Sequence, residues 1–84
     1  MPHARKHENV RSMPASIQVQ FGKSIRRLRL KRKLSQERLA DLAGMHVTYL
    51  GRIERGGQNI SLANIEKLAR GLRVKPGDLF KGIR

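Results

Sequence analysis

The stretch Ser35–Gly56, SQERLADLAGMHVTYLGRIERG, is the most informative part of the chain, because its small, apolar and glycine positions suit two short helices that cross closely. Ser35 can cap a helix that begins at Gln36. The inner face of this helix would carry Leu39, Ala40 and Ala43. Gly44 would end it, since glycine adopts a positive φ without a steric penalty.

A second helix is predicted from about Met45 to Arg55. Steps of about 100° per residue divide it into two faces. The inward face would carry His46, Tyr49, Leu50 and Ile53, and the outward face Val47, Thr48, Gly51, Arg52 and Arg55. Two helices in this order, residues 36–55, are typical of a helix-turn-helix, whose second helix enters the major groove of DNA.

The rest of the chain predicts three more helices and no strand. The first spans about Ser16–Lys33, with Phe21, Ile25 and Leu28 on its core face. The fourth follows a cap at Ser61, and its apolar stripe is Leu62, Ile65, Leu68, Ala69 and Leu72. Pro76 opens a last short helix. We therefore expect an all-α, compact five-helix domain over residues 16–84, preceded by a disordered basic arm, residues 1–15.

The net charge of the chain indicates what kind of partner it binds. Nineteen Lys and Arg against six Asp and Glu give a formal charge of +13, which favours a polyanion. Anionic lipid is the main alternative, but the first helix lacks the bulky apolar stripe of a membrane-surface helix. The basic face of the first helix, including Lys23 and Arg27, would contact phosphates. No apolar run approaches the roughly 20 residues that span a bilayer, so we expect a cytoplasmic, nucleoid-associated protein.

An enzyme is disfavoured, because the chain has no cysteine, three scattered histidines and no phosphate-binding glycine loop. His3 and His7 have the spacing of a metal pair, but no third ligand follows them. We expect no metal, no cofactor and no small-molecule ligand.

From Phe21 to Phe80 the chain resembles the phage-repressor family of helix-turn-helix domains, which includes the lambda repressor and Cro. The resemblance rests on several spaced segments: IRRLRLKRKLSQERLA at 25–40, AG at 43–44, YLGRIERG at 49–56, ISLANIEKLARGL at 60–72 and DLF at 78–80. Within that family, residues 46–72 look most like the controller proteins of restriction-modification systems. The resemblance implies a transcriptional regulator of double-stranded DNA.

The resemblance also implies roles for single residues. Gln36 matches a position that meets a phosphate, and Arg55 is a further phosphate candidate. The base-reading positions are Val47, Thr48 and Arg52, and Arg52 can bind guanine through O6 and N7. Arg29 and Glu54 match an internal ion pair that fixes the angle between two helices. Because Val47 offers no hydrogen bond, part of the specificity would depend on DNA shape.

One recognition helix reads only a few base pairs, so we expect a homodimer on a palindromic operator. The family places the dimer contact near the last helix, where the candidates are Leu79, Phe80, Ile83 and Ile65. Alternatively, Leu79 and Phe80 close the core of the monomer. The alternative function is an antitoxin or a coactivator-bridging protein built on the same domain.

Overall fold

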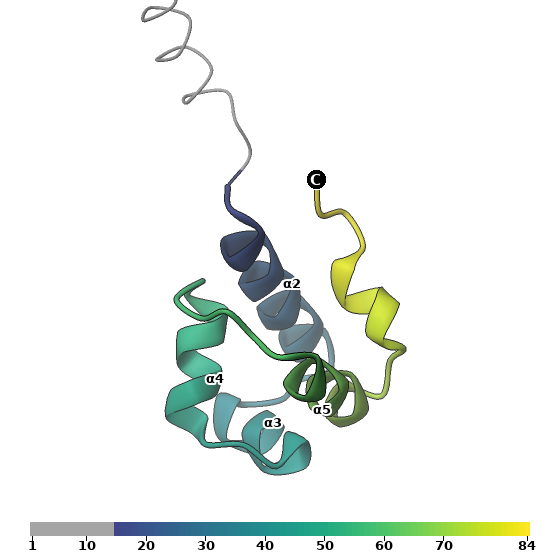
Figure 1. The fold of residues 1–84 in the computed structure, drawn as a ribbon. Coiled ribbons are helices and arrows are strands. Elements are labelled where there is room, and N and C mark those ends of the chain that lie inside the picture. The colour runs from purple at the N-terminus through teal and green to yellow at the C-terminus, as the bar shows by residue number, and fades with distance from the viewer. Residues whose placement is uncertain (1–14) are drawn as a thin grey trace, which may run out of the picture.

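The computed structural model describes residues 15–84, which form four α-helices followed by one short 3₁₀-helix (Figure 1). No strand occurs in this range. The all-helical prediction is therefore confirmed for the described residues, but the predicted fifth helix is a 3₁₀-helix rather than an α-helix. The predicted disorder of the arm concerns residues that, apart from Ala15, lie outside the described range.

Helix α2 spans Ile17–Lys31 and begins at the predicted cap, where the Ser16 hydroxyl accepts a hydrogen bond from the Val19 N–H. It buries Phe21 and Ile25 as predicted. The helix ends two residues earlier than expected, because Lys33 takes a left-handed backbone with φ 59°.

Helices α3, Gln36–Ala43, and α4, Val47–Glu54, form the predicted pair. Ser35 caps α3 by accepting from the Arg38 N–H at 3.0 Å, and Gly44 ends it with φ 67°. The prediction that α4 begins near Met45 with His46 facing inward was wrong. His46 is the exposed N-cap residue with extended backbone, so the helical period does not apply to it.

Helix α5 spans Leu62–Leu72, and its cap is Ser61, whose hydroxyl accepts from the Asn64 N–H. Leu62 is 84% exposed, contrary to its predicted place in the apolar stripe, because the core-facing stripe of α5 begins only at Ile65. The 3₁₀-helix η1 spans Pro76–Phe80. Its five residues are too few for a stable α-helix.

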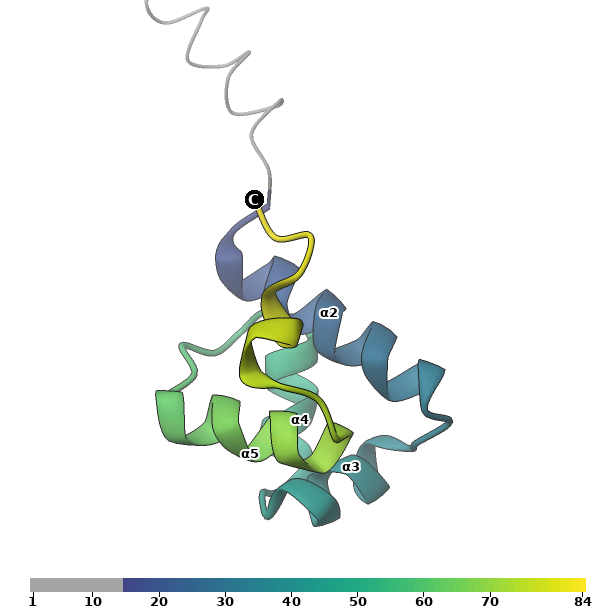
Figure 2. The ribbon, with the colours of Figure 1, turned by 90° about the vertical axis from the view of Figure 1, so that its right-hand side faces the viewer.

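The core lies where α3 packs on α5 and α2 on α4 (Figure 2). Six side chains are fully buried there: Ile25, Leu39, Leu50, Leu68, Leu72 and Leu79. At the crossing of α2 and α4, a Cβ on Gly22 would collide with the carbonyl oxygens of Ile53 and Glu54. The absence of a side chain at this position therefore allows the end of α4 to approach α2.

Candidate nucleic-acid interface

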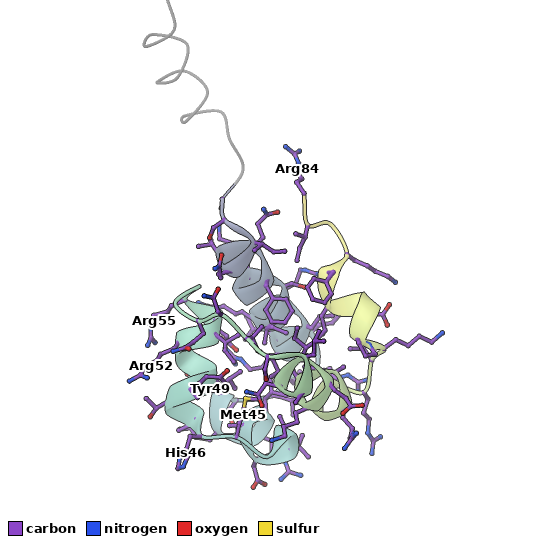
Figure 3. All side chains as sticks on the ribbon, viewed as in Figure 1. Met45, His46, Tyr49, Arg52, Arg55 and Arg84 are labelled. Atoms are coloured by element: carbon purple, nitrogen blue, oxygen red, sulfur yellow. The ribbon has the colours of Figure 1, made fainter. Side chains whose placement is uncertain are left out.

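Helix α4 presents one side to solvent and the other to the domain. In Figure 3, His46, Arg52 and Arg55 project from the outer side of α4, whereas Met45 and Tyr49 point towards α5. The outer side therefore carries cations on a surface that none of the other helices of residues 15–84 covers.

The inner side of α4 fixes the helix against rotation. Leu50 and Ile53 are buried in the core. The Tyr49 hydroxyl accepts a hydrogen bond from the Asn64 side-chain amide at 3.1 Å, which joins α4 to α5. Any partner that meets the outer side therefore meets a helix held in one orientation.

The end of α4 is tied to α2 by the Arg29–Glu54 ion pair. Arg29 Nε donates to Glu54 Oε2 at 2.7 Å, and Arg29 Nη2 donates to Glu54 Oε1 at 3.0 Å. Arg29 Nη1 donates to the Leu34 carbonyl at 2.9 Å. The two side chains are only 9% and 4% exposed. The hydrogen bond to Glu54 raises the pKa of Arg29 although burial opposes the rise, so the guanidinium group remains charged.

Gln36 joins the same group of polar side chains, which the sequence did not predict. Its side-chain amide donates to Glu54 Oε1 at 3.0 Å, so the amide nitrogen expected to meet a phosphate is already engaged inside the protein. Gln36 is the first residue of α3, where backbone N–H groups have no acceptor within the helix. Its backbone N–H is therefore the group suited to an anion.

One hollow of about 300 Å³ is lined by the first residue of α3, three residues of α4 and the residue that follows α4: Gln36, Val47, Thr48, Gly51 and Arg55. We call this the α4 hollow. Gly51, which the helical period places on the outward face, is nevertheless buried. Arg55 covers it, with Nη1 at 3.2 Å from the place where a Cβ would stand.

Comparison with known proteins places this geometry in a family. A family model described as helix-turn-helix matches residues 25–79, which is more than half of the chain. The chain belongs to the helix-turn-helix family. Like its relatives in this family, it is a DNA-binding transcription regulator and not an enzyme.

Relatives of this helix-turn-helix chain include control proteins. C.BamHI of Bacillus amyloliquefaciens is 47% identical over 69 residues, which are 81% of this chain and 85% of the relative. C.MunI of a Mycoplasma species is 40% identical over 80% of this chain and 92% of its own length. The crystal structure of the restriction-modification controller protein C.AhdI from Aeromonas hydrophila has a TM-score of 0.74 at 49% identity, over 75% of this chain and 96% of that chain.

Two predicted phosphate contacts of the helix-turn-helix chain lie apart from α4. Lys23 and Arg27 line a different hollow, between α2 and the carboxyl end of the chain, together with Lys81 and Ile83. The carboxyl end is held near the start of α2, where the Arg84 N–H donates to Gln20 Oε1 at 3.0 Å. The structure thus brings together Gln36, Val47, Thr48 and Arg55, but not the two residues of α2.

The four candidate residues for the dimer contact differ in how exposed they are. Leu79 has no exposed surface and belongs to the core, so it cannot reach a partner. Ile65 is 9% exposed, Ile83 is half-buried and Phe80 is 37% exposed. Phe80 packs on Phe21 with ring centroids 5.1 Å apart. An apolar hollow of about 190 Å³ runs beside this pair and includes Ile17, Ile60 and Ile65 in its lining.

No helix among residues 15–84 is long and apolar enough to cross a bilayer.

Proposed function

We propose that this chain is a controller of a restriction-modification system that binds a palindromic operator as a homodimer, with residues 46–55 in the major groove. The observation that carries the proposal is the contrast between the two sides of α4. Its inner side is fixed by Tyr49 and Glu54, while its outer side offers Arg52 and Arg55 to an external anion. The names of the relatives with 40–49% identity support the assignment to restriction-modification.

We assign base reading to the first and last turns of α4. Arg52 forms two hydrogen bonds with guanine, Thr48 contacts a base by its hydroxyl or methyl group, and Val47 makes apolar contact with a thymine methyl. Val47 is 38% exposed, so it has a free apolar surface for that contact.

We assign phosphate binding to the α4 hollow. Gln36, at the start of α3, and Arg55 both line it, and the Gln36 backbone N–H and the Arg55 guanidinium would bind a phosphate there. Lys23 and Arg27 contribute to the general positive field. The arm, residues 1–15, adds the cations Arg5, Lys6 and Arg11 along flanking DNA, ahead of the binding domain of residues 16–84.

We assign the dimer contact to the apolar hollow beside Phe21 and Phe80. Ile17 is 56% exposed at its rim, and a symmetric contact would cover both Ile17 and Phe80. Two copies supply two recognition helices for the two halves of a palindrome.

Selection of bound duplexes from a random DNA pool, with the mass of the complex measured alongside, tests the proposal. We expect enrichment of a short palindrome bound by two copies. Enrichment of a single half-site by one copy would refute the dimer but keep the DNA reading. No enrichment would refute operator binding and favour the antitoxin or bridging function.

A further inference from the structure

A second group of cations lies on the side of the molecule away from α4. Four arginines line one hollow of about 280 Å³ between the end of α2, helix α3 and the end of α5: Arg32, Arg38, Arg70 and Arg73. We call it the four-arginine hollow. Figure 1 shows α4 at the left and the end of α5 at the right, and in Figure 2 α5 faces the viewer with α4 behind it. DNA bound to the outer side of α4 therefore leaves this hollow open.

The charges of the four-arginine hollow are only partly compensated. Two guanidinium groups have exposed carboxylate partners: Arg38 with Asp41 at 3.2 Å and Arg70 with Glu66 at 3.4 Å. Arg32 and Arg73 have no carboxylate within 4 Å among residues 15–84, and Arg32 Nη2 points at the Arg73 carbonyl at 3.4 Å. Exposed pairs of this kind are weak and exchange partners readily, so the hollow keeps a net positive charge.

The backbone at Arg73 is one that glycine can also adopt. Arg73 ends α5 with φ 58°, a left-handed conformation that glycine adopts at less cost. Gly44 ends α3 in the same conformation, with φ 67°. Lys33, after the end of α2, has the same left-handed backbone with φ 59°, so the conformation assigns no role to a side chain, but a glycine would fit position 73 without steric cost.

We propose that the four-arginine hollow docks an acidic protein segment that carries both carboxylates and an apolar side chain. Guanidinium groups bind carboxylates in bidentate fashion. Leu34 and Leu42 supply apolar surface in the same hollow, and Leu42 is 44% exposed. A free phosphate compound or a DNA backbone would leave these leucines unused. Because all four arginines are exposed, the hollow suits a macromolecule that lies across it.

A second copy of this chain does not supply the complementary charge. The sequence contains only six acidic residues. Glu54 is buried against Arg29, Asp78 is paired with Lys81, and Asp41 and Glu66 are already paired with Arg38 and Arg70. Glu8 and Glu37 are the two that remain, against four arginines in the hollow. The occupant is therefore a different protein, and it binds while the regulator is on DNA.

The test uses the full chain and a short labelled peptide rich in glutamate with leucines on one helical face, read by fluorescence anisotropy. The test variant is Arg70→Gln/Arg73→Gly, in which glycine relieves the backbone strain at position 73, so folding is preserved. The matched control is Arg26→Gln/Lys67→Gln, which removes two exposed charges outside the hollow. A peptide with glutamine in place of glutamate reports the carboxylate contribution, and inorganic tripolyphosphate serves as the phosphate competitor.

We expect the acidic peptide to bind with and without the selected duplex present, and its affinity to fall about tenfold in the test variant but not in the control variant. Four results would overturn the proposal. Displacement of the peptide by the duplex would show that it occupies the α4 side. Equal losses in both variants, or no binding, would show that the hollow has no selective role. Tighter binding of tripolyphosphate than of the peptide, lost in the test variant only, would show that the site takes phosphate.

Discussion

Arg29 and Arg52 carry the same guanidinium group on helices that pack against each other, yet their surroundings are opposite. Arg29 lies inside the domain, where it donates to both oxygens of Glu54 and to the Leu34 carbonyl. Arg52 is exposed on the outer side of α4 and has no carboxylate partner within 4 Å among residues 15–84. The first arginine fixes the position of α4, and the second is left available for DNA.

The comparison separates two ways of losing function. A change at Arg29 disturbs the support of the recognition helix, so it should be visible in stability before DNA is added. A substitution at Arg52 removes an exposed group that does not stabilise the fold, so its effect should be measurable only in DNA binding.

The largest effect is expected for Arg29→Met. The change leaves the Glu54 carboxylate, 4% exposed, without its cation, and we expect a loss of about 3–5 kcal/mol in the free energy of unfolding. Urea denaturation followed by circular dichroism measures it.

The matched control for this change is Arg29→Met/Glu54→Leu, which removes both charges. Because no unpaired charge then remains, the double variant should recover much of the lost stability. If the single and double variants were equally unstable, the ion pair would matter through packing alone.

Arg52→Ala should leave the unfolding free energy within about 0.5 kcal/mol of the parent, because the side chain is exposed and makes no ion pair among residues 15–84. On DNA, it should relax discrimination at one base pair of each half-site by about 1–3 kcal/mol. Equilibrium binding to the selected operator and to its single-base variants measures this. Equal weakening on operator and random DNA would reassign Arg52 to phosphate.

Sequence periodicity was informative where helices have regular interiors and less so at their ends. Leu39, Ala40 and Ala43 are buried as predicted, because they lie on the face of α3 that packs on α5 and α4. His46 and Leu62 were misplaced, since each lies at the start of a helix and beyond its packed face.

The prediction of site residues from the sequence was also incomplete. The sequence pattern paired Arg29 with Glu54 by resemblance, and the structure places them in contact. It did not indicate that Gln36 donates to the same carboxylate or that Arg55 lies over Gly51, because both depend on the direction of a flexible side chain. The separation of Lys23 and Arg27 from α4 depends on where the carboxyl end folds, which α2 alone does not specify.

Gly51→Ala should raise the stability of the domain while it weakens DNA binding. A Cβ at this position meets only the end of the Arg55 side chain, so the usual gain of about 0.5–1 kcal/mol for alanine over glycine in a helix should appear. Affinity for all DNA should fall several-fold, because Arg55 is displaced from the α4 hollow.

A double-mutant cycle with Arg55→Ala checks the cause. In that background Gly51→Ala should have no further effect on DNA affinity, since the displaced side chain is already absent. An undiminished effect would mean that the alanine methyl group itself obstructs DNA.

The smallest effect is expected at Asp78, which lies in η1 rather than in α2 or α4. Its pKa is lowered first by the hydrogen bond with Lys81 and then by the Lys75 N–H, which donates to Asp78 Oδ2 at 3.0 Å. A lowered folded-state pKa means that Asp78 stabilises the fold above the ordinary carboxyl pKa of about 4, and that the contribution is lost as the pH falls through the folded value. Asp78→Asn should therefore lower the melting temperature slightly at neutral pH and not at all in strong acid. Because η1 covers the core through Leu79, the substitution should weaken the packing of η1 on α5 and α2. It should leave the Arg29–Glu54 pair and DNA recognition by α4 intact.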